Sequence, residues 1–158
     1  MRKNKFLIFC LLLLLILNSC VFQLRKPLDL DYQSYAITGD SSELSKFIHK
    51  QLSFTDIKEN EDGNADLIIE IMKNDFAKRI LSLAGNGQVG EFELIQTIEY
   101  RFKTNGQWSE SRRLEAVREY TYDPSLYNAA AAEESLLKDS MIQQLSRSLI
   151  SEINNIGK

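Results

Sequence analysis

Apolar and polar residues alternate with a period of two between residues 91 and 103. The apolar residues of this segment at even positions are Phe92, Leu94, Ile98, Tyr100 and Phe102, and most of the odd positions are charged or polar. Gln96 and Ile95 break the alternation. Successive side chains of a strand point to opposite faces, so the period predicts a strand with one buried and one wet face, typical of antiparallel sheets.

Two Asn-Gly pairs, Asn86-Gly87 and Asn105-Gly106, flank this strand. Asn-Gly between two β-type segments favours a type I′ hairpin turn, because both central residues need a positive φ. We therefore expect neighbouring strands over residues 65–83 and about 108–122. A further, first strand is expected over residues 32–37, which are rich in residues that favour strands.

Two other segments repeat their apolar residues every three or four positions. The first covers residues 41–53, and Asp40 and Glu43 at its start have a spacing that resembles a capping box. The second covers residues 127–155, and its stripe contains Leu137, Met141, Leu145, Leu149 and Ile153. Both segments are predicted to be amphipathic helices. Glu133 and Glu134 are expected to stabilise the first turns of the second helix through its dipole.

The predicted order of elements is β-α-β-β-β-α. A sheet with one apolar face needs a cover, and two amphipathic helices supply it. The sequence thus predicts an α+β fold, a two-layer sandwich in which a four-stranded, mostly antiparallel sheet is covered by two helices. Residues 32–158 are expected to form this single domain. The charged face of the sheet is expected to meet solvent or a partner.

The chain begins with a positively charged start and twelve apolar residues, 6–17. Spanning a bilayer takes about 20 such residues, so this segment is more typical of a secretory signal. The sequence Leu-Asn-Ser-Cys at 17–20 resembles a bacterial lipobox, which implies cleavage before Cys20 and lipid attachment, palmitate included, to that cysteine. We expect residues 1–19 to be a lipoprotein signal peptide and 20–31 a lipidated tether. The alternative is a short, uncleaved signal anchor.

Charge and cysteine content narrow the possible functions. The expected signal peptide removes three of nineteen Lys and Arg and no acid, so the remainder carries 16 minus 22, or −6. An acidic chain argues against a nucleic-acid partner. Cys10 lies in the expected signal peptide and Cys20 is the expected lipid acceptor. No thiol would then remain for a disulfide, a metal ion or nucleophilic catalysis.

The sequence lacks the motifs of the common enzyme classes. It contains no G-x-S-x-G, no P-loop and no G-x-G-x-x-G. His49 is the only histidine, and it lies beside the apolar stripe of the first predicted helix. A zinc site needs several His or Cys ligands. We therefore expect no enzymatic activity, no metal site and no cofactor.

Arginines are the candidate ligand-binding residues, because the planar guanidinium group binds phosphate in a bidentate manner. They lie on the third and fourth predicted strands, which could bring them to one rim of the sheet. Arg118 shares its parity with Leu114 and Tyr120, so it could pair inside instead. The alternative for the whole set is ordinary cross-strand pairing with glutamates. The candidates are Arg101, Arg112, Arg113 and Arg118.

Several short motifs, taken in order, resemble the LPS-assembly lipoprotein family, LptE. The first is the lipobox with the aromatic residue and Leu-Arg that follow it, at 20–25. The others are Leu44-Ser45 with Gln51-Leu52, Asn86-Gly87-Gln88, Val117-Arg118-Glu119-Tyr120 and Asp123-Pro124. Val21 stands where a glycine is usual, and Gly85 where polar or basic residues are common. The resemblance covers essentially the whole chain after the signal and implies the same β-α-β-β-β-α fold.

The resemblance also implies a function and partners. It implies an outer-membrane lipoprotein, lipid-anchored and facing the periplasm, whose partner is the large LptD-type β-barrel protein that exports lipopolysaccharide. Such a protein plugs the barrel, assists its assembly and contacts lipopolysaccharide, without catalysis. The alternative is a generic lipid-anchored periplasmic domain that binds a small apolar or anionic ligand and has no barrel partner. A lipoprotein enzyme is a third, weaker option.

Overall fold

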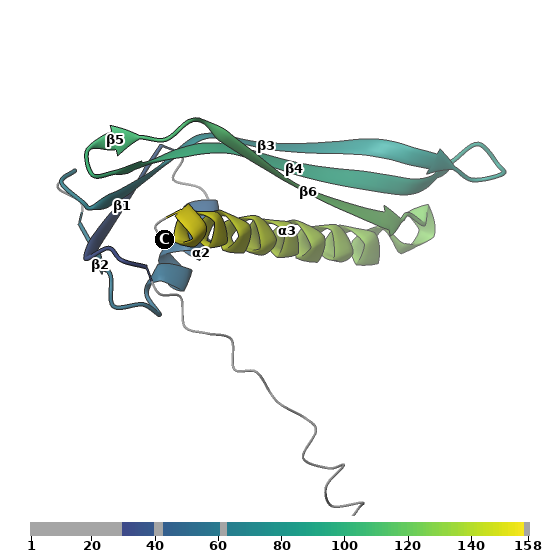
Figure 1. Cartoon of the computed structure of the whole chain (residues 1–158). Coiled ribbons are helices and arrows are strands. Elements are labelled where there is room, and N and C mark those ends of the chain that lie inside the picture. The colour runs from purple at the N-terminus through teal and green to yellow at the C-terminus, as the bar shows by residue number, and fades with distance from the viewer. Residues whose placement is uncertain (1–29, 40–42, 61–62, 157–158) are drawn as a thin grey trace, which may run out of the picture.

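The computed structural model of the chain describes residues 30–39, 43–60 and 63–156. One mixed sheet forms the first layer, and two helices on one of its faces form the second (Figure 1). The predicted α+β architecture is therefore confirmed, although the number of strands differs from the predicted four. The assignments of residues 1–29, which include the expected signal peptide, lie outside the described residues.

The described part of the sheet contains six strands. They are β1 (Ser34–Gly39), β2 (Lys58–Glu59), β3 (Leu67–Leu83), β4 (Val89–Thr104), β5 (Gln107–Trp108) and β6 (Arg112–Thr121). Their order is β2-β1-β3-β4-β5, and β6 also pairs with β4. β1 is parallel to β2 and β3, whereas the pairs of β4 with β3, β5 and β6 are antiparallel.

The two additional strands are only two residues long, too short to show a period in the sequence. β2 lies in a polar stretch that predicts a turn. β5 takes Trp108 from the start of the expected fourth strand, which begins instead at Arg112. The break between β5 and β6 begins at Ser109, whose backbone amide donates to the Phe102 carbonyl at 2.8 Å. The Ser109 hydroxyl accepts from the Phe102 amide at 3.1 Å.

The β3–β4 hairpin runs along the long axis of the molecule (Figure 1). Its register shifts between Ile71 and Lys73, so that Ile71 lies opposite Tyr100 but Asn74 lies opposite Ile98. This bulge moves the helix-facing positions of β3 from odd to even residue numbers. The shift depends on the partner strand, and the sequence of β3 alone did not predict it.

Two helices cover the sheet unequally. α2 (Glu43–Leu52) is short, whereas α3 (Tyr127–Ile156) runs along most of the hairpin (Figure 1). A single 3₁₀ turn, η1 (Pro124–Leu126), precedes α3, and the Asp123 carboxylate caps it by accepting from the Ser125 amide at 2.8 Å. α2 and α3 are joined by a hydrogen bond of 2.6 Å between the side chains of Gln51 and Ser146.

The core lies between the even-numbered face of β4 and the helices, as the alternation predicts. The residues that form it include Leu94, Ile98, Tyr100, Met141, Leu145 and Leu149, and all are at most 1% exposed. Gln96, the polar exception in the alternation, is also buried, and its amide donates to the Asn74 side chain at 2.6 Å. Its burial is therefore compensated by a hydrogen bond.

Candidate functional site

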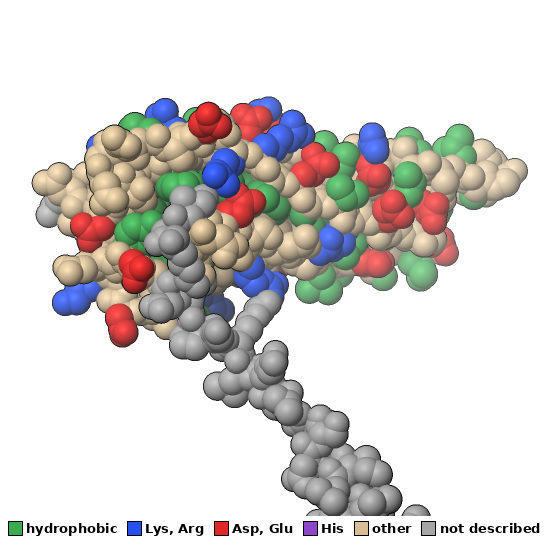
Figure 2. Space-filling model, viewed as in Figure 1, with side chains coloured by type: hydrophobic (Ala, Val, Ile, Leu, Met, Phe, Trp, Pro, Cys, Tyr) green, Lys and Arg blue, Asp and Glu red, His purple; other side chains and the backbone are tan. Residues whose placement is uncertain are grey.

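The face of the sheet that points away from the helices carries a layer of charged side chains, which we call the open face. The register across β3, β4 and β6 places Lys73, Glu99 and Arg113 in one row and Asp75, Thr97 and Glu115 in the next. Charged side chains of both signs lie along this upper side of the molecule in Figure 2. The prediction of a polar second sheet face is therefore confirmed.

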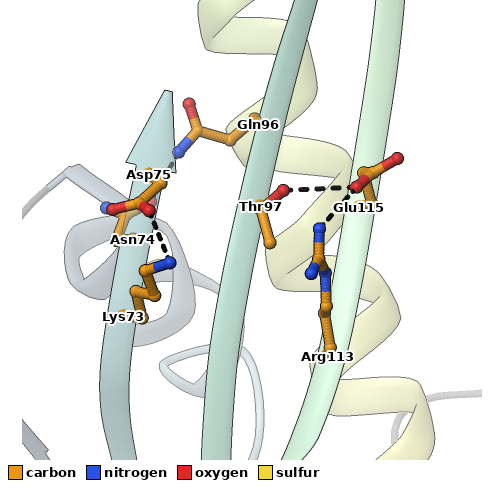
Figure 3. A network of polar contacts seen from close by, with 7 residues as sticks. All are labelled: Lys73, Asn74, Asp75, Gln96, Thr97, Arg113 and Glu115. Carbon is orange, nitrogen blue, oxygen red and sulfur yellow. Dashed lines mark hydrogen bonds and ion pairs between the residues drawn. The ribbon is translucent and has the colours of Figure 1, made fainter. Parts of the chain in front are cut away.

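Neighbouring charges on the open face pair with one another (Figure 3). Lys73 Nζ lies 2.8 Å from an Asp75 oxygen, and Arg113 lies 3.0 Å from Glu115. The Thr97 hydroxyl donates to the same Glu115 carboxylate at 3.3 Å. Thr97 is buried, but the four side chains of the two ion pairs are well exposed. Exposed ion pairs contribute only about 0–1 kcal/mol. They leave the face polar, and a partner could replace them at little cost.

Charge is not evenly distributed along the open face. The half nearest β5 is mainly basic, because its rows contain Lys73, Arg101, Lys103 and Arg113 together with Glu70 and Glu99. The half nearest the β3–β4 turn is mainly acidic, with Asp75, Glu91, Glu93, Glu115 and Glu119 together with Arg79. An anionic ligand would therefore be attracted to the basic half.

Only two of the four candidate arginines lie on the open face. Arg113 pairs there with Glu115, as described above. Arg101 forms an ion pair with Glu70, and its guanidinium carbon lies 4.3 Å from the centre of the Trp108 ring. Arg101 and Arg113 are thus both in the basic half, where their charges could meet a ligand.

Arg112 and Arg118 instead lie on the helix side of β6. Arg112 is opposite Tyr100 in the register and lies 3.4 Å from Glu152 of α3. Arg118 donates to the Gln144 side chain of α3 at 2.6 Å. The placement of all four arginines on one rim is therefore wrong. For Arg118, the alternative of pairing inside is confirmed. The physical reason is the period of a strand, which points adjacent residues such as 112 and 113 to opposite faces.

A cluster of hydrogen bonds and ion pairs joins the first half of α3 to the sheet. The Glu134 carboxylate accepts from Lys78 at 2.6 Å and from the Tyr120 hydroxyl at 2.9 Å, and it lies 2.7 Å from Lys138. Burial disfavours the charge, but the hydrogen bonds from Lys138, Lys78 and Tyr120 outweigh it and lower the pKa of Glu134 to about 2. Glu134 lies beyond the first turn of α3, so its predicted role at the helix dipole is replaced by this tertiary role.

The cluster predicts an acid-dependent loss of stability. Because the pKa of Glu134 is lowered on folding, its contribution is present above the unfolded value, near 4.5, and is lost as the pH falls toward 2. Glu134→Gln should lower the free energy of unfolding by about 1–3 kcal/mol at neutral pH. The difference from the native protein should shrink between pH 4.5 and 2, as measured by urea unfolding at several pH values. A difference that does not change over this interval would contradict this role of Glu134.

The only histidine and the possible metal ligands were the other residues considered for catalysis or metal binding. His49 lies 3.1 Å from the Tyr35 hydroxyl and 3.4 Å from Glu59. Among the described residues there is no group of three or more His, Cys, Asp or Glu side chains that could hold a metal ion. In the same part of the chain, no helix is both long and apolar enough to cross a membrane.

A surface depression between α2 and α3 is lined by Lys46 and Lys50 but also by Glu43 and Asp139, so it does not select one sign of charge.

Comparison with known proteins extends this description. The curated LPS-assembly lipoprotein LptE of Pectobacterium atrosepticum is 22% identical over 163 residues, which cover 99% of this chain and 89% of that protein. The solution structure of lipoprotein B from Nitrosomonas europaea has a TM-score of 0.72 and 25% identity, over 85% of this chain and 91% of that one. The crystal structure of rare lipoprotein B from Shewanella oneidensis has a TM-score of 0.66 and 25% identity, over 79% and 98%.

The family model named LptE, described as lipopolysaccharide-assembly, matches residues 26–153. This range includes all described strands of the sheet, the whole of α2 and all of α3 except its last three residues. The two solved structures agree with it, since both are of lipoproteins with this fold. The chain therefore belongs to the LptE family of lipopolysaccharide-assembly proteins.

Proposed function

We propose that this protein is a non-enzymatic lipoprotein on the periplasmic side of the outer membrane, anchored through Cys20. It plugs an LptD-type β-barrel, assists the assembly of that barrel and contacts lipopolysaccharide during its insertion in the outer leaflet. Residues 1–19 are the signal peptide, 20–31 the tether and 32–158 the domain. The observation that carries the proposal is the match of the LptE family to residues 26–153.

The open face supports the role of a plug. The interior of a transmembrane β-barrel is polar, so a protein that occupies it needs a polar surface. The open face presents charges of both signs along three strands, and several of these charges form ion pairs within the face. Such a surface can exchange its weak internal ion pairs for pairs with the barrel wall at little cost in free energy.

The basic half of the open face supports contact with lipopolysaccharide, which is anionic. Arg101 and Arg113 lie there, and each can offer a planar pair of N–H donors to a phosphate. Arg112 and Arg118 have partners in α3 and hold that helix against β6. The proposed ligand contact therefore rests on Arg101 and Arg113, and the other two arginines position the sheet and the helix.

Reversing both charges of the basic half should weaken lipopolysaccharide binding. We expect the double variant Arg101→Glu, Arg113→Glu to lose at least tenfold in affinity, which corresponds to about 1.4 kcal/mol. The loss should be smaller at high salt, because screening already weakens the native interaction. The measurement is the lipopolysaccharide affinity at two salt concentrations, together with the amount of barrel that co-purifies with each variant.

The matched control is Lys46→Glu with Lys50→Glu, which makes the same change in charge on the exposed side of α2. This control should bind lipopolysaccharide like the native protein. Both double variants should melt close to the native temperature, since surface substitutions usually change stability by about 0.5 kcal/mol or less. Equal affinities of the two double variants would show that the basic half of the open face is not the contact.

A further inference from the structure

β3 is much longer than the strand that pairs with its outer side. β1 runs parallel to β3 only from Leu67 to Ile71, whereas β4 pairs with β3 as far as Leu83. Beyond Ile71 no described strand lies on the outer side of β3, which continues past β1 toward the β3–β4 turn (Figure 1). The pairing with β4 has no register shift from Lys73 to Ile80. We call this regular segment, residues 73–80, the β3 edge.

The hydrogen bonds on the other side of β4 show how its backbone groups alternate. The Tyr122 amide donates to the Gly90 carbonyl at 2.8 Å, and the Ser109 amide donates to the Phe102 carbonyl at 2.8 Å. In an antiparallel pair, the N–H and C=O groups of one residue point to the same side of the strand. Even-numbered residues of β4 therefore direct these groups toward β5 and β6, and odd-numbered residues direct theirs toward β3.

The register transfers this alternation to the β3 edge. Ala77 lies opposite Ile95 and Arg79 lies opposite Glu93, so the odd-numbered residues of the β3 edge bond to β4. The N–H and C=O groups of the even-numbered residues then point outward, to the side where no described strand lies. The residues with outward backbone groups include Phe76, Lys78 and Ile80.

The charged side chains of the β3 edge protect it poorly. Natural strand edges are often kept from pairing by charged side chains, lysine above all. Here, however, Lys78 Nζ lies 2.6 Å from Glu134 of α3 and 3.9 Å from the centre of the Phe92 ring in β4. Arg79 forms an ion pair with Glu93, which is also in β4. Both cations are thus drawn over the sheet and away from its outer side.

β6 is the other long strand with a described neighbour on one side only, and its edge is better protected. Val117 lies opposite an odd-numbered residue of β4, so its carbonyl points outward. The Arg118 guanidinium donates to this carbonyl at 2.8 Å. The β3 edge instead exposes apolar side chains, because Phe76 and Ile80 are 39% and 55% exposed. Of the two edges, that of β3 is the better surface for an additional strand.

We propose that an extended segment of the β-barrel partner adds to the β3 edge as a further strand of the sheet. This inference rests on the proposed function and names a backbone surface through which the plug holds the barrel. Asp75 and Arg79 of the β3 edge belong to the open face, so the edge borders the surface proposed to meet the barrel. The strands of a closed barrel wall are all paired already, so the added segment comes from one of the barrel's loops.

The side chains next to the β3 edge indicate the sequence pattern of that segment. Added strands bind through main-chain hydrogen bonds, and their alternate side chains give specificity. On the helix side the segment passes Phe76 and Ile80, so alternate residues should be apolar. On the other side it lies beside Asp75 and Arg79, so the remaining residues should be polar. We expect a loop segment of about five or six residues with this alternation.

Hydrogen exchange of single amides tests the added strand directly. The full mature lipoprotein would be compared free and in its purified complex with the barrel, by mass spectrometry that resolves single amides. In the free protein the outward amides of Phe76, Lys78 and Ile80 should exchange quickly, and those of Ala77 and Arg79 slowly. In the complex the three outward amides should slow at least tenfold, because each gains a hydrogen-bond acceptor.

The edge of β6 provides the internal control. The amides of Glu115 and Val117 point outward there, because both residues lie opposite odd-numbered residues of β4. These two amides should exchange at the same rate in the free protein and in the complex. Equal slowing at both edges would show that the barrel only excludes water, and it would overturn the addition of a strand to β3.

The other outcomes separate this inference from the proposed function. Unchanged exchange at the β3 edge, in a complex that contains the barrel, would overturn the added strand and leave the role of a plug intact. Failure to recover any barrel would overturn the proposed function and this inference with it. Slowing that appears in the free protein as its concentration rises would assign the edge to a second copy of the chain and overturn the barrel segment.

Ile80→Pro tests one outward N–H by substitution. Proline has no N–H, and it is tolerated at strand edges and at bulges such as the register shift that follows Ile80. The matched control is Ile80→Ala, which also loses the apolar side chain but keeps the N–H. We expect Ile80→Pro to retain at least threefold less barrel than Ile80→Ala, with similar melting temperatures. Equal recovery of the barrel by the two variants would contradict pairing at this residue, and the exchange measurement decides the proposal without any substitution.

Discussion

Leu145→Asp is expected to unfold the domain. Leu145 is 1% exposed and lies in the middle of the stripe with which α3 packs against the sheet. An unpaired carboxylate at this position would be desolvated, and such changes cost more than about 4 kcal/mol. A domain of this size is stable by only about 5–15 kcal/mol, so most of that stability would be lost. Circular dichroism and thermal melting measure the effect.

The matched control for Leu145→Asp is Ser151→Asp, which places the same acid on the exposed side of α3. The control should retain the native circular dichroism spectrum and a melting temperature close to the native one. A Leu145→Asp protein that melts like the control would show that this stripe of α3 is not the face that builds the core.

Cys20→Ala is expected to abolish lipidation. The thiol of Cys20 is the expected acceptor of the diacylglycerol, and a residue without a thiol cannot replace it. Labelling with a clickable fatty acid measures the effect.

The chain supplies a control for Cys20→Ala in its other cysteine. Cys10 lies in the apolar segment of the expected signal peptide, so Cys10→Ala should be labelled like the native protein. Continued labelling of the Cys20→Ala protein, or equal loss of label in both variants, would contradict the assignment of Cys20 as the lipidated residue.

The sequence predicted the long elements because each carries its own periodic signal. The even-numbered apolar residues of β4, from Leu94 to Phe102, are buried as the alternation predicts. The α3 stripe behaves in the same way at Met141 and Leu149. These patterns extend over ten residues or more, so a local irregularity does not hide them. The fold class therefore follows from the sequence alone.

The details that the sequence did not predict depend on partners distant in the chain. The bulge after Ile71 exists only in relation to β4, and two-residue strands such as β5 carry no period. The Glu134 cluster joins α3 to Lys78, which is 56 residues away in the chain. None of these three features leaves a signal in the residues near it.

The candidate site was predicted in part. The polar face and the positions of Arg101 and Arg113 on it follow from the alternation of β4 and β6. Arg112 was placed incorrectly. Because adjacent residues of a strand point to opposite faces, Arg112 and Arg113 could not both lie on the open face. The division of the open face into basic and acidic halves needed the strand register. The alternation in residues 91–104 describes β4, which is only one of the three strands that form the open face.

The amount of barrel protein bound to this lipoprotein in its own membrane tests the central claim most directly. An affinity-tagged copy would be purified from gently solubilised outer membranes, and the co-purifying proteins would be identified and quantified by mass spectrometry. We expect one large LptD-type β-barrel for each lipoprotein, with lipopolysaccharide in the same fraction. Recovery of the lipoprotein without any barrel partner would contradict it.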